Sequence, residues 1–355
     1  MTERPELPDF DKMNCPLPLM DHDSIQLAHG AGGLLSADLI DKLIMPRFAS
    51  PELEMLEDQA VLTLPPGRVA FSTDTFVVSP IFFPGGDIGD LAINGTVNDV
   101  AMSGAEVTAL SVGFVLEEGL PMADFHRVLC SMETAAARAN VRIVTGDTKV
   151  VGKGSCDGIF INTSGLGVIP EGVHLSAASL APGDVVILSG TLADHGMAVM
   201  TVREGLSFQS TVSSDTAALN GLIKTILAAG PGTKTLRDPT RGGAATTLNE
   251  FAKASKVGIK LDESAFSVRP DVAGACEILG IDPLYVANEG KLIAVVPAAE
   301  KEAVLAAMRG HEYGQEAAII GEVVAGHPGL VAMKTTFGAE RIVDMPVGEQ
   351  LPRIC

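Results

Sequence analysis

The sequence predicts a mixed α+β fold, and three observations support this. The expected strands come in adjacent pairs and do not alternate strictly with helices, which is typical of α+β proteins. The composition is rich in glycine, with 38 residues, and poor in aromatic side chains, with no tryptophan and two tyrosines. A chain of 355 residues, of which 46% are hydrophobic, can bury a sizeable core, and this length favours two domains over one.

Charge and termini exclude several classes of partner. The net charge of −19 argues against nucleic acids and anionic membranes, and no apolar run approaches the roughly 20 residues of a membrane helix. Residues 1–24 hold four prolines among acids and lack the basic and apolar regions of a signal peptide, so we expect a disordered extension. The five cysteines form no C-x-x-C pair, which favours reduced thiols. Together these features predict a cytoplasmic protein.

The hydrophobic pattern predicts the elements in order. In the first half it indicates helices at 34–44, 88–103 and 122–140, and strands at 59–64, 69–76, 107–116, 141–145 and 158–168. In the second half it indicates strands at 184–189, 258–261, 292–296 and 317–323, and helices at 195–203, 215–229, 241–254, 270–279 and 299–308.

A proline- and glycine-containing break at 169–172 divides the chain. We therefore expect an N-terminal domain at 25–168 and a C-terminal domain at 169–333. The final segment, 334–355, contains Pro346, Gly348 and Pro352 and should bury little surface, so a mobile tail that carries Cys355 is expected.

A glycine-rich loop, His29-Gly30-Ala31-Gly32-Gly33, precedes the first expected helix. Closely spaced glycines let backbone N–H groups approach phosphate oxygens. The loop matches neither the Walker A nor the Rossmann pattern, and glycine clusters are more often plain turns. A phosphate-binding role therefore depends on other residues that indicate the same ligand.

Aspartates in small-residue surroundings point to the same ligand. Asp58, Asp74 and Asp147 are expected at strand ends or in turns, and Asp99 lies in the helix predicted at 88–103. Mg²⁺ sites use a few carboxylates and leave room for phosphates and water. Such aspartates also serve as ordinary caps and turn residues. The set favours a metal–nucleotide site over that alternative.

The same helix carries a polar stripe. Asp90, Asn94 and Asn98 recur every four residues and share one face, with Asp99 at its margin. A polar face is usually solvated. Aspartate and asparagine, in place of lysine and glutamate, are less typical of a surface, so the stripe is predicted to contact the ligand.

Two motifs of the second half complete the set. The segment 237–243, Arg-Asp-Pro-Thr-Arg-Gly-Gly, places Asp238 on a tight turn, and Asn288-Glu289-Gly290-Lys291 places a lone acid before a buried-looking strand. Taken alone, each is an ordinary turn.

In this order, the motifs resemble the PurM-type ATP-binding superfamily, which includes aminoimidazole ribonucleotide synthetase, selenophosphate synthetase and thiamine monophosphate kinase. The resemblance runs from about His29 to the end of the chain. The terminus Pro352-Arg353-Ile354-Cys355 is similar to the hallmark of the HypE family of NiFe-hydrogenase maturation proteins. Two departures stand out: a longer N-terminal extension, and a loop at 29–33 without the Cys or selenocysteine and the Lys of selenophosphate synthetase.

The resemblance implies a PurM-like two-domain protomer whose N-terminal domain forms a β-barrel shared across a homodimer, with ATP near the interface. It implies ATP and Mg²⁺ as cofactors, with the metal held by Asp58, Asp74, Asp99 and Asp238. The nucleotide would be bound by His29, Gly30, Gly32, Gly33, Asp90, Asn94, Asn98, Asp147, Thr148 and Lys149.

The activity that the resemblance implies is ATP-dependent dehydration of a carbamoyl group on the Cys355 sulfur to a thiocyanate. Cys355, Lys149 and Glu289 are then the catalytic residues, with Glu289 as the base. A HypF-like carbamoyltransferase would load the sulfur, and a HypC–HypD-like scaffold would take the cyanide for iron. Two alternatives are a superfamily enzyme acting on a free small molecule and a nucleotide-binding scaffold without activity.

Overall fold

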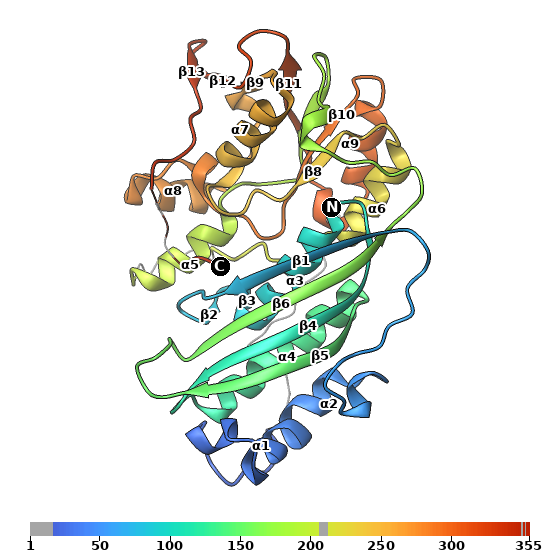
Figure 1. Cartoon of the computed structure of the whole chain (residues 1–355). Helices are drawn as coiled ribbons and strands as arrows, with labels where there is room; N and C mark the ends of the chain where they lie inside the picture. The colour runs from blue at the N-terminus through green and yellow to red at the C-terminus, as the bar shows by residue number, and fades with distance from the viewer. Residues whose placement is uncertain (1–16, 206–211, 349–350, 352) are drawn as a thin grey trace.

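The computed structural model describes residues 17–205, 212–348, 351 and 353–355. Within them the chain forms two main sheets, one from each half, with helices packed on them (Figure 1). The first sheet has the strand order β1-β6-β4-β5, and the second has the order β13-β12-β9-β11-β7-β10-β8. The expected mixed α+β character is confirmed.

The first sheet has one covered face. Helices α3 (Ile88–Ala101) and α4 (Met122–Ala139) lie behind it in Figure 1. The Asp87 side chain caps α3 by accepting hydrogen bonds from Gly89 N and Asp90 N. A Cβ on Gly89 would lie 2.5 Å from Val128 O of α4, so glycine permits the close approach of the two helices. The strands are β1 (Arg68–Phe76), β2 (Phe82–Phe83), β3 (Gly86–Asp87), β4 (Glu106–Glu117), β5 (Arg142–Val151) and β6 (Ile159–Ile169).

The other face of this sheet is bare in the single chain. Alternate residues of β1 point to it, and Phe71 and Val69 are 66% and 49% exposed there. The glycine loop is a single turn of 3-10 helix, Leu27–Gly30, followed by the short helical pieces α1 (Leu34–Leu39), Ile40–Ile44 and α2 (Met45–Phe48).

The second sheet is buried at its centre. Strands β7 (Val185–Leu188) and β10 (Ile293–Val296) are buried at every position, which agrees with their uninterrupted apolar sequences. The other strands are β8 (Thr235–Arg237), β9 (Gly258–Asp262), β11 (Ala318–Val324), β12 (Val331–Lys334) and β13 (Glu340–Ile342). The helices are α5 (Asp194–Arg203), α6 (Asn220–Ala229), α7 (Gly243–Ser255), α8 (Pro270–Leu279) and α9 (Lys301–Arg309).

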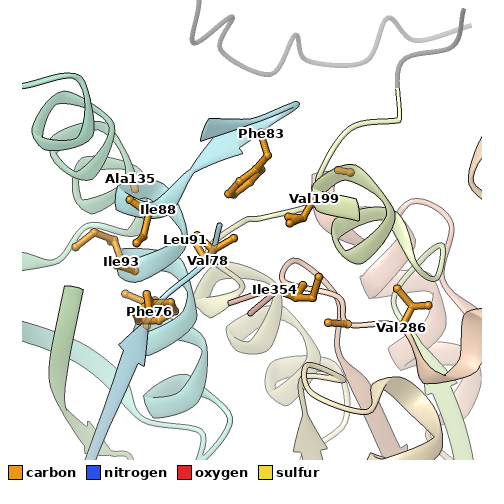
Figure 2. Packing of buried hydrophobic residues seen from close by; sticks show 14 of the residues in the cluster. Phe76, Val78, Phe83, Ile88, Leu91, Ile93, Ala135, Val199, Val286 and Ile354 are labelled. Atoms are coloured by element: carbon orange, nitrogen blue, oxygen red, sulfur yellow. The ribbon is translucent and has the colours of Figure 1, made fainter. Parts of the chain in front are cut away.

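One hydrophobic core joins the two halves. Figure 2 shows Ile354 between Val78 and Leu91 on the side of the first sheet and Val286 on the side of the second. Ile354 is only 3% exposed. The expectation that the final segment buries little is therefore wrong at its end, because this side chain fills the seam between the halves. The domain boundary after residue 168 stays a prediction.

Three predicted elements differ from the observed ones. Residues 59–64 form no strand, because no neighbouring segment of the described chain pairs with them. Helix α6 begins at Asn220 rather than Asp215, since residues 214–219 form no helix and Leu219 N donates to Asn98 Oδ1 of α3. Strand β5 continues to Val151, so the prediction that Asp147 lies at a strand end or in a turn is wrong. Residues 1–16 of the predicted disordered extension lie outside the described residues, while Ser24 bridges to Pro121.

No helix among the described residues is long and apolar enough to span a bilayer. Cys156, Cys276 and Cys355 are free thiols. Cys130 is disulfide-bonded, so the expectation of reduced thiols is wrong for this residue.

Candidate active site

Three predicted metal ligands gather beside β1. Ser72 Oγ donates a hydrogen bond to Asp99 Oδ2 at 2.9 Å, which joins β1 to α3. Burial raises the pKa of Asp99, and burial followed by the charges of Asp99 and Asp74 raises the pKa of Asp238 to about 7. Arg241 Nη2 lies 3.9 Å from Asp74 Oδ1. Carboxylates that raise one another's pKa form a site of concentrated negative charge.

Glu289 lies in the same cluster and is 3% exposed. Burial, and then the charges of Asp238 and Asp215, raise its pKa well above the ordinary value. Its Oε1 is buried without a hydrogen-bond partner in the described part of the chain. Close packing requires glycine at position 95 of α3, because a Cβ there would lie 2.9 Å from the Phe76 ring and 4.0 Å from Glu289 Oε2. A buried acid with a free oxygen is suited to exchange a proton with a ligand.

Cys355 lies within electrostatic range of Glu289. Burial first, and then the charges of Glu289 and Asp74, raise the pKa of its thiol to about 12, while Arg241 opposes this rise. The sulfur is therefore a neutral thiol in this position at physiological pH and a poor nucleophile. Acquisition of a group by the sulfur is disfavoured while Cys355 occupies this position.

The glycine loop forms a second group, together with β5. A Cβ on Gly30 would lie 2.8 Å from Val150 N, so the loop packs directly on this strand. His29 is buried, and its Nδ1 accepts a hydrogen bond from Gln26 N at 2.8 Å. Gly32 has φ +75°, a conformation that favours glycine. Asp147, Thr148 and Lys149 are neighbours of Val150 on β5, so the predicted triphosphate residues and the loop lie together.

The two groups lie on opposite faces of the first sheet. Asp147 pairs with Gly113, Gly113 with Asn162, and Asn162 with Thr75, so these four residues form one row on the bare face. Asp74, one residue before Thr75, points to the covered face. The row spans three strand spacings, or about 14 Å. One chain therefore does not bring Asp147 and Lys149 to the acidic cluster.

Comparisons with known proteins identify the family. Residues 56–169 match the N-terminal domain model of AIR synthase related proteins, and residues 181–333 match the C-terminal domain model. The carbamoyl dehydratase HypE of Azotobacter vinelandii is 54% identical over 332 residues, which covers 94% of this chain and 97% of the relative. The chain belongs to the HypE family.

Two solved structures of HypE extend the match to the fold. A crystal structure of HypE in complex with ATP is 49% identical, with a TM-score of 0.89, and covers 93% of this chain and 99% of that one. HypE in a HypE–HypF complex is 49% identical, with a TM-score of 0.77, over 87% and 99% of the two chains. The two-domain mixed α/β architecture is that of HypE.

The polar stripe of α3 faces the second half of this HypE-family chain. Asn98 Nδ2 donates to Ala217 O at 3.0 Å, and its Oδ1 accepts from Leu219 N at 2.7 Å. Asn94 Nδ2 donates to Asp90 Oδ1 and Thr216 Oγ1, both at 3.1 Å. These amides hold the two halves together. Direct contact of the stripe with nucleotide stays a prediction.

The four predicted metal ligands do not form one metal cage. No group of three His, Cys, Asp or Glu side chains among the described residues is arranged to hold a metal ion. Asp74, Asp99 and Asp238 share one charged region, whereas Asp58 is exposed on the segment before β1. An open set of carboxylates fits Mg²⁺, which commonly keeps phosphate and water ligands. The role of Asp58 stays a prediction.

Sequence reasoning missed a charged network beneath Glu289. Lys291 Nζ lies 3.0 Å from Asp215 Oδ2 and 3.7 Å from Asp194 Oδ2, and Asp215 Oδ1 accepts from Glu289 N at 3.2 Å. Lys291 and Asp215 also line a cavity of about 680 Å³, which neither the acidic cluster nor Cys355 reaches. The only sequence signal was the position of Lys291 two residues after Glu289.

Proposed function

We propose that this chain dehydrates a carbamoyl group carried on Cys355, with ATP as the phosphoryl donor. The observation that carries the proposal is the position of Cys355 beside Glu289, a buried acid with a raised pKa and an unpartnered oxygen. ATP appears in the solved HypE complex, and carbamoyl dehydratase is the name of the relatives.

The oxygen of the thiocarbamate attacks the γ-phosphorus of ATP, and ADP leaves. The C–O bond then breaks with loss of phosphate, while two N–H protons are removed in all, and the carbon–nitrogen bond becomes a nitrile. Phosphorylation turns a poor leaving group into a good one. Glu289 accepts an N–H proton in its ionised form, because the raised pKa makes that carboxylate a stronger base than an ordinary one once it has released its own proton.

The acidic cluster is proposed to hold Mg²⁺ with the phosphates of ATP. The bound metal would neutralise charge on the transferring phosphoryl group. Asp74, Asp99 and Asp238 supply the carboxylates, and their mutual repulsion is relieved when a cation binds. Asp238, with a pKa raised to about 7, then becomes fully ionised.

The nucleotide site is proposed to be completed by a second copy of the chain. The bare face of the first sheet carries the apolar side chains of Phe71 and Val69, and a homodimer that covers it would form the shared barrel. In such a dimer the loop 29–33 and Lys149 of one chain can meet the acids of the other. This explains why one chain separates residues that the family motifs associate.

Membership of the family supports the proposed partners and location. A HypF-like carbamoyltransferase is proposed to load Cys355, since a HypE–HypF complex has been solved for a relative. A HypC–HypD-like complex is proposed to accept cyanide, and the cytoplasm is the proposed location. The alternative, a free small-molecule substrate, is not favoured because Cys355 occupies the place beside Glu289.

The deciding experiment is the intact mass of the full chain after incubation with MgATP, carbamoyl phosphate and its carbamoyltransferase. We expect an ATP-dependent thiocyanate on Cys355, and neither adduct in Cys355→Ala. A carbamoyl adduct that persists with ATP bound would contradict the dehydratase assignment. ATP hydrolysis without any adduct on Cys355 would favour a free substrate.

A further inference from the structure

The last three residues are held through their backbone. Val77 N donates to Cys355 O at 3.1 Å, and Ser79 N donates to Arg353 O at 3.4 Å. The segment that follows β1 therefore runs beside the terminus as a short antiparallel neighbour. Its N–H groups fix the register of the tail on one side.

Helix α5 holds the tail from the other side. His195 Nε2 lies 2.9 Å from Ile354 O, and Arg203 Nη2 donates to Arg353 O at 2.6 Å. Because a carbonyl oxygen only accepts, Nε2 of His195 carries the proton, and Nδ1 can accept from Ser214 Oγ at 2.8 Å. His195 is fully buried, and burial lowers its pKa, so the ring stays neutral in this tautomer.

We propose that His195 and Arg203 are positioning residues that hold the C-terminal tail by its carbonyl oxygens and thereby set Cys355 beside Glu289. The catalytic consequence rests on the proposed function, whereas the clamp itself does not. The four tail-holding hydrogen bonds described above go to main-chain atoms of residues 353–355. They are unchanged by a group added to the sulfur, so one clamp can seat the thiol, carbamoyl and cyano forms.

The remaining tail permits release. Asn249 Nδ2 donates to Val343 O at 2.8 Å, and this bond anchors the chain before the tail. Twelve residues follow Val343. Twelve extended residues span about 40 Å. The tail is therefore long enough to reach a partner after release, and loss of the clamp should make release more frequent.

The test measures how fast iodoacetamide alkylates each free cysteine of the full-length chain, with peptide mass spectrometry as the readout. We expect His195→Ala and Arg203→Ala each to raise the rate at Cys355 about fivefold, the factor for one net hydrogen bond. Buried Cys276 is an internal control and should stay unreactive. His174→Ala, which removes an exposed histidine, should leave both rates unchanged.

A conservative variant separates positioning from general packing. His195→Gln can keep an N–H donor near Ile354 O, so it should restore part of the protection of Cys355. In single turnover, His195→Ala should slow dehydration of preloaded chain while the affinity for ATP stays the same.

Two results would overturn the proposal: unchanged reactivity of Cys355 in both alanine variants, or an equal rise at Cys276, which would mean a loosened fold. Faster alkylation of Cys355 in the alanine variants, together with no carbamoyl or cyano adduct on Cys355 in any form of the chain, would support the clamp and refute the proposed function.

Discussion

At the scale of single residues, buried carboxyls outside the site around Cys355 and Glu289 make the stability of the chain depend on pH. Burial first, and then the charge of Asp87, raise the pKa of Asp90 to about 8. Its Oδ2 has no hydrogen-bond partner among the described residues. Asp87, whose pKa is raised to about 6, and Asn94, Thr216 and Arg138 are the polar groups around it. Ionised Asp90 is therefore unfavourable in the folded chain.

This predicts a pH slope in stability. Between about pH 4 and pH 8 the folded chain keeps a proton on Asp90 that the unfolded chain has released, so stability falls as pH rises through this window. Asp90→Asn cannot titrate and also lowers the repulsion on Asp87. We expect a smaller fall in Tm between pH 5 and pH 8 for the variant than for wild type, by differential scanning fluorimetry. Parallel curves would show that Asp90 ionises freely.

Glu289 gives the sharpest chemical prediction. Glu289→Gln keeps the size of the side chain but removes the proton acceptor, so dehydration should fall by at least about a hundredfold. Intact mass should then show the carbamoyl form accumulating on Cys355 with ATP still bound. Glu302→Gln, an exposed change on α9, is the control and should behave as wild type. Normal turnover in Glu289→Gln would assign the base elsewhere.

At the scale of elements, helix α3 connects the two halves of the chain. Side chains on its polar face form hydrogen bonds with the segment 214–219. Its other side packs on α4 and the first sheet. Asn98 satisfies a backbone carbonyl and a backbone N–H of that segment. These groups would be buried and unpaired without it.

Asn98→Ala should therefore destabilise the chain by about 2–4 kcal/mol, since buried donors and acceptors lose their partners. Urea unfolding measures this. Asn220→Ala removes a single bond to Ala139 O from a partly buried site and should cost about 1 kcal/mol. Equal costs in the two variants would show that the α3 contacts are not special.

Local pattern predicted the helix at 88–103 and the strand at 107–116. Buried and half-buried residues alternate along most of β4, whereas α3 is buried at every position except Asp99. It did not predict the partner of the α3 stripe, since residues 214–219 lie more than a hundred positions away. The strand expected at 59–64 failed for a related reason: strand formation depends on a pairing neighbour, and the described residues offer none.

The site could be predicted only in part. Motif order placed Asp74, Asp99, Asp238 and Glu289 together by resemblance, although they come from four separate segments. Spacing alone could not show that Asp147 faces the other side of the sheet. His195 and Arg203 gave no signal, because histidine and arginine on an ordinary helix are unremarkable until the terminus folds onto them.

At the scale of the whole molecule, the proposed dimer depends on the bare sheet face. Phe71→Glu places a charge in the expected interface, so we expect a monomer by light scattering and weaker ATP binding, because the two halves of the nucleotide site then separate. Phe337 is 98% exposed on the turn between β12 and β13 and provides a matched control. Phe337→Glu should remain dimeric. A dimeric Phe71→Glu protein would place the interface elsewhere.

Mixing two inactive variants tests whether the nucleotide site is shared. Asp74→Asn should inactivate the acidic part of the nucleotide site, and Lys149→Ala should inactivate the part formed by the glycine loop and β5. If each site takes one half from each chain, mixed dimers contain one intact site and regain part of the activity. No recovery after subunit exchange would mean that each chain builds its own site.

The attachment of Cys355 to the protein also determines how turnover scales. The reacting group arrives on a tether, at an effective concentration on the order of mM, so the rate per molecule should not depend on how dilute the protein is. Each chain carries one carbamoyl or cyano group on Cys355 and must transfer the cyanide before it can accept another carbamoyl group. Under the proposed function the protein therefore behaves as a stoichiometric carrier, and the supply of cyanide is limited by the number of chains and the frequency of their visits to partners.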